Sequence, residues 1–342
     1  MLTADTFGLV VDIHAHAHAP VDELVAHREE HSREQAFQLS VFGPESVSVN
    51  QRLFRDEWHR SLTDLQTRLR AMDRAGVDVQ AVSVAPTQYF SWANEKLGDE
   101  LAHLVNEHLA GLAAKSGGRL VAMAHVALQH PDRAADQLRD AVRNYGMRSV
   151  QIPSRAGNRE FSDPALDVFW AAAEALGVLV FVHPWGCSLE QRLSSYYLGN
   201  VIGQPLETTI ALSRLIFAGV LDRFPRLRIC GAHGGGYLPV YLGRADHAYE
   251  VRPESRSMAR RPSDYLRQLY VDSLVYRPSE VVALTRELGT DRVLLGTDYP
   301  FDMGVTDPLA RLAETGLPPA ELRRIAGSTA AELLDLKEKE QT

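Results

Sequence analysis

Residues 8–16 read Gly-Leu-Val-Val-Asp-Ile-His-Ala-His, an apolar run that ends in two histidines separated by a single residue. Further short runs rich in Val, Ile and Leu follow along the chain, as expected for strands buried in a parallel sheet. The eight predicted strands are Gly8–His14, Asp78–Val84, Leu120–Ala127, Met147–Ile152, Val178–His183, Leu227–His233, Gln268–Ser273 and Arg292–Thr297.

Helical patterns fill the intervals between these runs. Residues 62–72 carry Leu or Met at every third or fourth position and are followed by Gly76, a residue type that commonly ends a helix. Residues 163–176 begin with Asp-Pro, a typical helix start, and are followed by Gly177. Alternating strands and helices favour either a closed barrel or an open doubly wound sheet. Because no Gly-rich dinucleotide loop follows the first strand, we predict an α/β fold of the (β/α)8 TIM-barrel type in one domain, residues 1–342.

Two segments between the predicted elements exceed ordinary loop lengths. Residues 19–60 form an insertion after the first strand, and residues 184–205 form a long loop after the fifth. Both would lie at the carboxyl ends of the strands, where barrels of this type keep their active sites. We therefore expect 19–60 to act as a lid or pocket segment, with 184–205 as a second pocket wall.

Composition excludes several classes of partner. The chain is 45% hydrophobic and 23% charged, with a net charge of −8, whereas nucleic-acid surfaces are ordinarily basic. No apolar run approaches the roughly 20 residues of a membrane span. Only Cys187 and Cys230 are present, and the N-terminus lacks a signal-like start. These features predict a cytoplasmic protein of a reducing compartment that binds neither nucleic acid nor membrane.

Histidine and aspartate side chains stand where four of the predicted strands end. His14 and His16 lie two residues apart, so both point to one face of the first strand. His183 ends the fifth strand, His233 the sixth, and Asp298 follows the eighth. Each alone has an ordinary explanation, such as a core histidine or a helix cap. Together, on the face where barrel active sites lie, they predict a metal site.

Imidazole nitrogens combined with a carboxylate oxygen and water suit one divalent cation. Zn²⁺ is the first expectation, and Mn²⁺, Fe²⁺ or Co²⁺ also accept such ligands. The predicted fourth strand, Met147–Ile152, contains no lysine that could bridge a second metal as a carbamate. We therefore predict one ion with an open coordination position.

Several longer motifs resemble one known family. They are DIHAH at 12–16, MDRAGVDVQAVS at 72–83, FVHPW at 181–185, AHGGGYLP at 232–239, LGR at 242–244, YVDSLVY at 270–276 and LGTDYPF at 295–301. These motifs resemble the amidohydrolase superfamily, specifically amidohydrolase-related family 2 and its branch of metal-dependent decarboxylases. Because they occur in order along nearly the whole chain, the resemblance implies the family's (β/α)8 barrel throughout.

The resemblance also implies roles for the residues at the strand ends. It makes His14, His16, His183 and Asp298 the metal ligands. It makes His233 the general acid/base beside the metal-bound water. Asp298, while bound to the metal, is the alternative proton donor.

Substrate contacts follow from the same resemblance. Either Arg52 or Arg55 matches an arginine that binds the substrate carboxylate, and we prefer Arg55. Trp185 is expected to line the pocket. Arg244 matches an arginine that reaches the neighbouring subunit's active site, which implies a homodimer; a surface salt bridge is its alternative role.

The chain departs from the family pattern around the predicted pocket. Residues 19–60 contain no lysine, although close relatives have a basic residue there. Phe-Asp-Met-Gly at 301–304 replaces the Phe-Pro-Leu-Gly that relatives tend to carry, and Gly-Cys-Ser at 186–188 replaces a more polar, acidic stretch. These differences concern the substrate and leave the predicted metal ligands intact.

The expected function is non-oxidative decarboxylation, a carbon–carbon lyase reaction, of an aromatic or muconate-type carboxylic acid. A metal-dependent hydrolase or hydratase, such as a lactonase or amidohydrolase, is the main alternative because the same ligands support it. A non-catalytic barrel that binds a metal or a small ligand is a third possibility. Release of CO2 distinguishes the first from the second, and metal-dependent turnover distinguishes both from the third.

Overall fold

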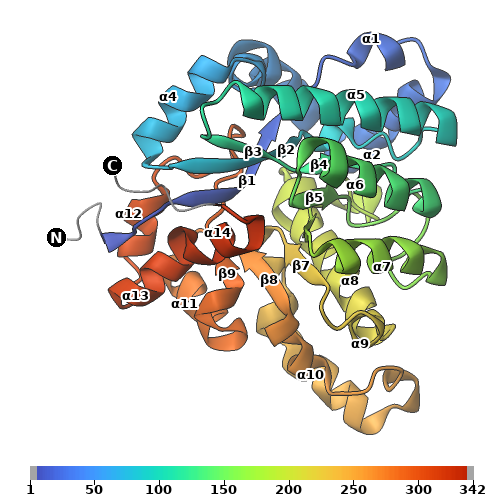
Figure 1. Cartoon of the computed structure of the whole chain (residues 1–342). Coiled ribbons are helices and arrows are strands. Elements are labelled where there is room, and N and C mark those ends of the chain that lie inside the picture. Colours follow the sequence, from blue (N-terminus) through green and yellow to red (C-terminus); the bar gives the residue numbers. More distant parts are fainter. Residues whose placement is uncertain (1–5, 337–342) are drawn as a thin grey trace.

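Parallel strands alternate with helices in the computed structural model, which describes residues 6–336 (Figure 1). All strand pairings between named strands are parallel. The strands are β1 (Val11–Ala17), β2 (Val79–Val84), β3 (Leu120–Ala122), β4 (Ala124–His125), β5 (Ser149–Ile152), β6 (Leu179–Val182), β7 (Arg228–Gly231), β8 (Leu269–Asp272) and β9 (Val293–Leu294). The predicted α/β class with parallel strands is confirmed.

These strands form two sheets, of order β1-β2-β3 and β4-β5-β6-β7-β8-β9, whereas one continuous barrel was predicted. The predicted third strand is divided at Met123 into β3 and β4, although the Met123 amide still donates to Val82 O at 2.9 Å. At the other edge, the Ile13 amide donates to Leu295 O at 2.9 Å, just beyond the two-residue strand β9. Backbone hydrogen bonds therefore connect β1 with the chain that follows β9.

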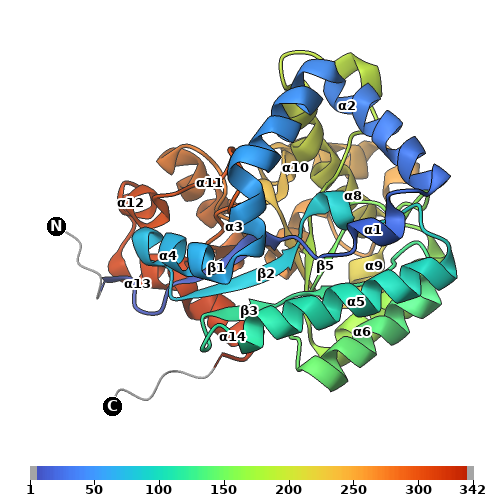
Figure 2. The same ribbon diagram turned by 90° about the horizontal axis from the view of Figure 1, so that it is seen from above.

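Helices surround the strands (Figures 1 and 2). They are α1 (Asp22–Val25), α2 (Glu29–Leu53), α3 (His59–Thr63), α4 (Leu65–Ala75), α5 (Glu95–Ala114), α6 (Pro131–Tyr145), α7 (Asp167–Leu176), α8 (Gln204–Phe217), α9 (Val220–Arg223), α10 (Leu238–Val251), α11 (Pro278–Leu288), α12 (Pro308–Ala313), α13 (Pro319–Arg323) and α14 (Thr329–Leu334). Gly76 and Gly177 adopt the left-handed conformation directly after α4 and α7, as predicted from their positions. The Asp163 carboxylate accepts a hydrogen bond from the Ala165 amide at 2.9 Å, which caps the start of the turn before α7.

Residues 19–60 differ from the long loop that the sequence suggested. They form α1, α2 and a single π-helical turn, Phe54–Trp58. Gly43, with φ of 76°, and Pro44 interrupt the helical geometry of α2. Glu, Gln and Arg are frequent around them and favour helix, so a helix with an internal kink results. Residues 184–203 remain largely irregular, with short turns at Glu190–Leu193 and Gly199–Gly203.

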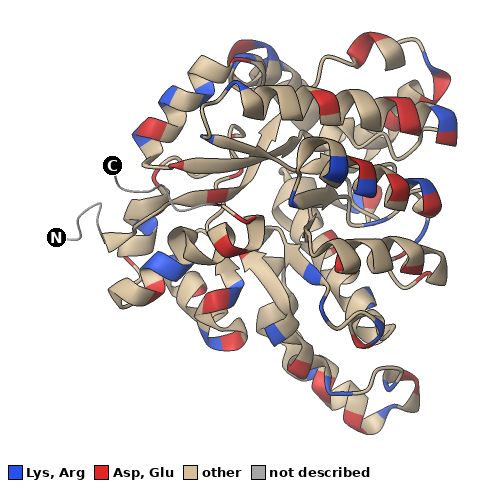
Figure 3. Cartoon of the chain, in the orientation of Figure 1, with Lys and Arg blue, Asp and Glu red and all other residues tan. Residues whose placement is uncertain are grey.

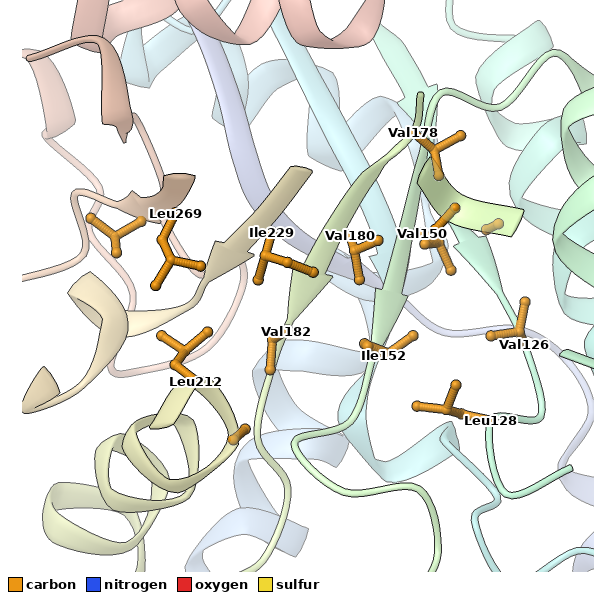
Figure 4. Close-up of a cluster of buried hydrophobic side chains, with 14 of the residues drawn as sticks. Val126, Leu128, Val150, Ile152, Val178, Val180, Val182, Leu212, Ile229 and Leu269 are labelled. Carbon is orange, nitrogen blue, oxygen red and sulfur yellow. The ribbon is translucent and has the colours of Figure 1, made fainter. Parts of the chain in front are cut away.

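The strands are buried on both faces. On one face, Val150, Val180 and Ile229 lie in the cluster between strands and helices, near Leu212 of α8 (Figure 4). On the other face, Phe181 belongs to a second buried cluster, which also contains apolar side chains of β1, β2 and β7. Charged residues lie mainly on the surrounding helices (Figure 3). None of the helices between residues 6 and 336 combines the length and apolar character that crossing a membrane requires.

His125, on β4, provides a test of how burial affects stability. It is 3% exposed, and burial lowers the pKa of its imidazole to about 4. Above pH ~6.5 both folded and unfolded chains hold this histidine neutral; below it, only the unfolded chain gains the proton until the pH approaches 4. We expect this residue to lower the free energy of unfolding by up to about 3 kcal/mol as the pH falls through that window.

Denaturant unfolding between pH 7 and 4 measures this effect. Across the window, unfolding of the wild type should take up about one more proton than unfolding of His125→Gln. The free energy of unfolding of the wild type should therefore fall more steeply as the pH is lowered. His103→Gln, which alters an exposed histidine on α5, is the matched control and should keep the wild-type slope. Equal slopes in wild type and His125→Gln would contradict the expectation.

Candidate metal centre

Two histidines of β1 begin the site. His14 and His16 are both fully buried, and their ring centroids lie 5.2 Å apart. Alternation along the strand sends both side chains to the same face, as predicted. Their Nδ1 atoms are occupied: that of His14 lies 2.6 Å from Asp272 Oδ2, and that of His16 lies 3.1 Å from Ser83 Oγ. The Nε2 atoms therefore remain to face the site.

His183 and Asp298 meet these histidines from other strands. His183 follows β6, and its ring centroid lies 4.9 Å from those of His14 and His16. Asp298 follows β9, and its Oδ1 lies 3.3 Å from His14 Nε2 and 3.2 Å from His16 Nε2. One potential ligand atom from each of the four residues falls within 4.8 Å of all the others. The fold thus brings together the four residues that the sequence predicted.

Several of the converging atoms are buried without a hydrogen-bond partner. They are the Nε2 atoms of His14 and His16, both ring nitrogens of His183, and Asp298 Oδ1. Leaving buried polar atoms unpaired costs free energy, so such a concentration requires an explanation. Three imidazole nitrogens and a carboxylate oxygen match the donor set of a divalent cation such as zinc. The residues present therefore fit a single metal ion.

The protonation of the site fits the same interpretation. Burial lowers the pKa of His16 and, helped by the neighbouring histidines, holds the pKa of His183 well below its ordinary value. Burial alone would raise the pKa of Asp298, but His14 and His16 hold it well below its usual range. Burial opposes protonation of His14 also, yet Asp298 and Asp272 raise its pKa to about 10. A cation would therefore compete with a proton for the space between His14 and Asp298.

His233 lies beside these four residues. Its ring centroid is 5.1 Å from that of His183 and 5.3 Å from that of His14, and its Nδ1 is buried without a partner. The backbone turns sharply there, since His233 has φ of 56° and Gly236 has φ of 66°. A Cβ on Gly236 would lie 2.1 Å from Pro205 O, so only glycine fits that turn. His233 is thus adjacent to the predicted ligands and faces the same pocket.

Asp272, at the end of β8, is a site residue that the sequence interpretation missed. It is fully buried and contacts His14 Nδ1 at 2.6 Å through Oδ2. It also accepts hydrogen bonds from the His233 amide at 3.0 Å and the Gly234 amide at 2.7 Å. A single carboxylate therefore holds both a predicted ligand and the backbone of His233. The available signal was an aspartate ending the buried strand 268–273, the same signal that identified Asp298.

A cavity of about 810 Å³ opens above the site. His183, His233 and Asp298 lie at its lining, together with Trp185 and Arg55. Side chains of α2 and of the segment after β6 form other parts of its wall. Asp302 and Met303 also line it; they belong to residues 301–304, where the sequence differs from the family pattern.

The other predicted arginines lie elsewhere. Arg52, in the last turn of α2, is exposed and does not line the cavity. Arg244 is exposed on α10 and is likewise absent from the lining. Arg55, which is also exposed, is thus the one of the two alternative arginines that lines the cavity.

Comparisons with known proteins agree along most of the chain. The family model described as "Amidohydrolase" matches residues 11–336. The 2-amino-3-carboxymuconate-6-semialdehyde decarboxylase of Dictyostelium discoideum is 32% identical over 277 residues, covering 80% of this chain and 77% of that protein. The gamma-resorcylate decarboxylase of Rhizobium sp. (strain MTP-10005) is 30% identical over 259 residues, covering 71% and 79%.

A solved structure has a similar fold. The 5-carboxyvanillate decarboxylase of Novosphingobium aromaticivorans, complexed with manganese and 4-hydroxy-3-methoxy-5-nitrobenzoic acid, superposes with a TM-score of 0.85. It is 21% identical in sequence, and the match covers 98% of this chain and 100% of that one.

Proposed function

Because the chain belongs to the amidohydrolase family, we propose that it is a metal-dependent, non-oxidative decarboxylase, a carboxy-lyase of an aromatic or muconate-type carboxylic acid. The observation that carries this proposal is the convergence of His14, His16, His183 and Asp298, with unpartnered buried donor atoms, at a large pocket. Similar proteins named as decarboxylases support the choice of reaction.

We infer that these four residues hold one divalent cation. Zn²⁺ is the first candidate, with Mn²⁺, Fe²⁺ and Co²⁺ as alternatives, and manganese is present in a similar solved structure. Strand β5 offers no lysine for a second metal. When bound, the cation would orient an oxygen of the substrate and stabilise negative charge that develops on it.

His233 is proposed to supply the proton. When the bond between the carboxylate and its carbon breaks, CO2 leaves and the bonding electrons stay on the carbon. The His233 imidazolium then gives its proton to that carbon, and the ring regains one before the next turnover. A carboxylate and a proton thus become CO2 and a C–H bond. An imidazole can transfer a proton in both directions, and burial lowers the pKa of His233, which makes its imidazolium the stronger acid. Asp298 is the alternative donor.

Arg55 is proposed to bind the substrate's anionic group, with Trp185 as a flat apolar wall. Replacing Arg55 with alanine should raise KM about tenfold, since one charge-assisted hydrogen bond to the substrate is lost. Arg52→Ala is the matched control, because Arg52 is close in sequence and exposed outside the cavity lining. Steady-state kinetics of both variants test the assignment. A larger rise for Arg52→Ala would reverse it.

A homodimer is proposed through α10, which carries Arg244. Val240, Tyr241 and Val251 of this helix are 65%, 68% and 54% exposed. Val240 and Tyr241 lie four and three residues before Arg244, and Val251 lies seven after it, which places all of them on one side of the helix. An exposed apolar strip of this kind commonly marks a protein contact. A second copy seated there could bring Arg244 towards its neighbour's pocket.

We further assign residues 6–336 to one (β/α)8-barrel domain, with 19–60 as an inserted, pocket-covering segment; residues 1–5 and 337–342 of the predicted domain lie outside the described residues. The hydrogen bond between the Asp298 amide and His14 O, at 2.8 Å, supports closure between the first and last strands. Both cysteines are unpaired and buried, which fits a cytoplasmic, reducing compartment.

CO2 release from a panel of aromatic and muconate acids tests the reaction. The metal-loaded protein should release CO2 from at least one acid, lose this activity to a chelator, and regain it when Zn²⁺ or Mn²⁺ is returned. Lactones and amides in the same panel detect hydrolysis. Metal-dependent hydrolysis without CO2 release would replace the proposal with its alternative.

A further inference from the structure

Two buried polar atoms in the pocket wall remain unused by the proposed reaction. Among the described residues that line the cavity, unpartnered buried atoms occur on His183, His233 and Asp298, which the reaction employs. They also occur on His18, at Nδ1, and on Gln204, at Oε1. Buried polar atoms without partners are uncommon in folded proteins, so these two require an explanation of their own.

His18 is oriented by an aspartate. Its Nε2 lies 2.7 Å from Asp22 Oδ2, and because an ionised carboxylate can only accept, we place the hydrogen on Nε2. Gln88 Nε2 also lies 3.3 Å from this nitrogen, but its two hydrogens have acceptors in Ala19 O at 2.8 Å and Asp22 Oδ1. In the neutral ring, Nδ1 is then left with a lone pair and acts as an acceptor. The Gln88 amide nitrogen also lies 3.4 Å from Asp22 Oδ1, and the Phe54 ring packs edgewise at 5.5 Å from the His18 ring. The side chain is thus held in place while its second nitrogen is unpaired.

Gln204, the first residue of α8, shows the same arrangement with an amide. It is 6% exposed, and its Nε2 donates to Gly186 O at 3.3 Å. A carbonyl can only accept, so this contact assigns the nitrogen to Gly186 and leaves Oε1 as the unpaired atom. Gln204 therefore offers a second buried acceptor, on a different element of the pocket wall.

We propose that His18 and Gln204 are specificity-determining residues that accept hydrogen bonds from hydroxyl or amino substituents of the substrate. This inference rests on the proposed function for the identity of the ligand as a carboxylic acid. Both free atoms are acceptors, and Asp22, which lines the same cavity, adds a carboxylate beside one of them. Such a wall matches donors and disfavours a second anionic group, while Arg55 remains for the carboxylate.

The test compares acids that differ by one donor. Benzoate, each monohydroxybenzoate and the corresponding methoxybenzoate, which keeps the oxygen but lacks the hydrogen, are titrated calorimetrically into the Zn²⁺-loaded protein. The variants are Gln204→Met and His18→Phe, with His18→Asn as a second choice should the phenylalanine variant not fold. Gln38→Met is the matched control, since Gln38 lines the cavity but already donates to Glu34 at 3.3 Å.

We expect the wild type to bind at least one hydroxybenzoate about tenfold more tightly than its methoxy analogue. Gln204→Met and His18→Phe should each lose about tenfold for a hydroxy acid and change little for benzoate, with the bound zinc unchanged. Gln38→Met should keep the wild-type ratio. Equal losses for hydroxy acids and benzoate, or an unchanged ratio in both variants, would overturn the assignment.

Binding and turnover separate this inference from the function on which it rests. If the donor preference depends on these residues but no acid releases CO2, the proposed reaction fails and the recognition assignment stands. If CO2 is released while the variants retain the full donor preference, the reaction stands and the recognition assignment fails.

Discussion

Replacing His233 with asparagine is expected to reduce kcat for CO2 release by about 10²- to 10⁴-fold, the usual contribution of a positioned general acid. The imidazole lies 5.1 Å, between ring centroids, from His183 and shares the pocket with it. Asparagine can still form hydrogen bonds, but it cannot deliver a proton near neutral pH. The loss should therefore fall on kcat, with a smaller change in KM.

Metal content decides how this result is interpreted. His233 is outside the group of four converging residues, so the variant should bind as much zinc as the wild type by elemental analysis. His103→Asn, on the exposed side of α5, is the matched control and should leave kcat unchanged. If His233→Asn kept most of its activity with metal bound, Asp298 would become the better candidate for the proton donor.

Much of the metal centre was predictable because strand ends are strongly constrained. In a parallel sheet with helices between the strands, the carboxyl ends of all strands meet on one face. A histidine ending one apolar run and an aspartate ending another must then come close, whatever separates them in sequence. His14 and His183, which lie 169 positions apart, have ring centroids 4.9 Å from each other for this reason.

The pocket wall was less predictable. In the 19–60 segment apolar residues do not recur clearly at every third or fourth position, so the usual pattern of a helix is missing. Gly43 and Pro44 also suggest a break in the middle of what is one kinked helix. Arg52 and Arg55 are only three residues apart, and the helical turn between them decides that Arg55 lines the cavity and Arg52 does not. β1 ends at Ala17, so His18 lies just beyond the strand, and its pairing with Asp22 depends on the turn into α1.

Asp272 illustrates a further limit, because its importance lies in its contacts rather than its position. An aspartate that ends a strand can be a ligand, a helix cap or a support for other groups, and sequence does not distinguish these roles. Here it accepts from the backbone amides of His233, Gly234 and Leu274 and contacts His14 Nδ1, so both of its oxygens are engaged by these neighbours. It therefore orients its neighbours.

Replacing Asp272 with asparagine should weaken zinc binding about 10- to 100-fold, the usual cost of removing the group that orients a metal-binding histidine. Four donors, the His14 ring and the amides of His233, Gly234 and Leu274, now converge on the carboxylate, and an amide would present its NH2 to at least one of them. If the NH2 faces His14, Nδ1 of that ring must accept a hydrogen bond, so the ring proton moves to Nε2. Nε2 is the atom that would otherwise bind the cation. Competition titration with a zinc chelator measures the affinity, and Asp264→Asn, on an exposed residue, is the control.

Activity at saturating zinc then separates the two roles of Asp272. Support of His14 alone predicts full recovery of kcat once the ion is bound. Because the same carboxylate also holds the His233 and Gly234 amides, we expect recovery to be incomplete, with kcat remaining at least several-fold below that of the wild type. Unchanged zinc affinity would show that His14 keeps its orientation without Asp272. Full recovery of kcat would instead confine the residue to the metal site and leave the position of His233 to its glycine turn.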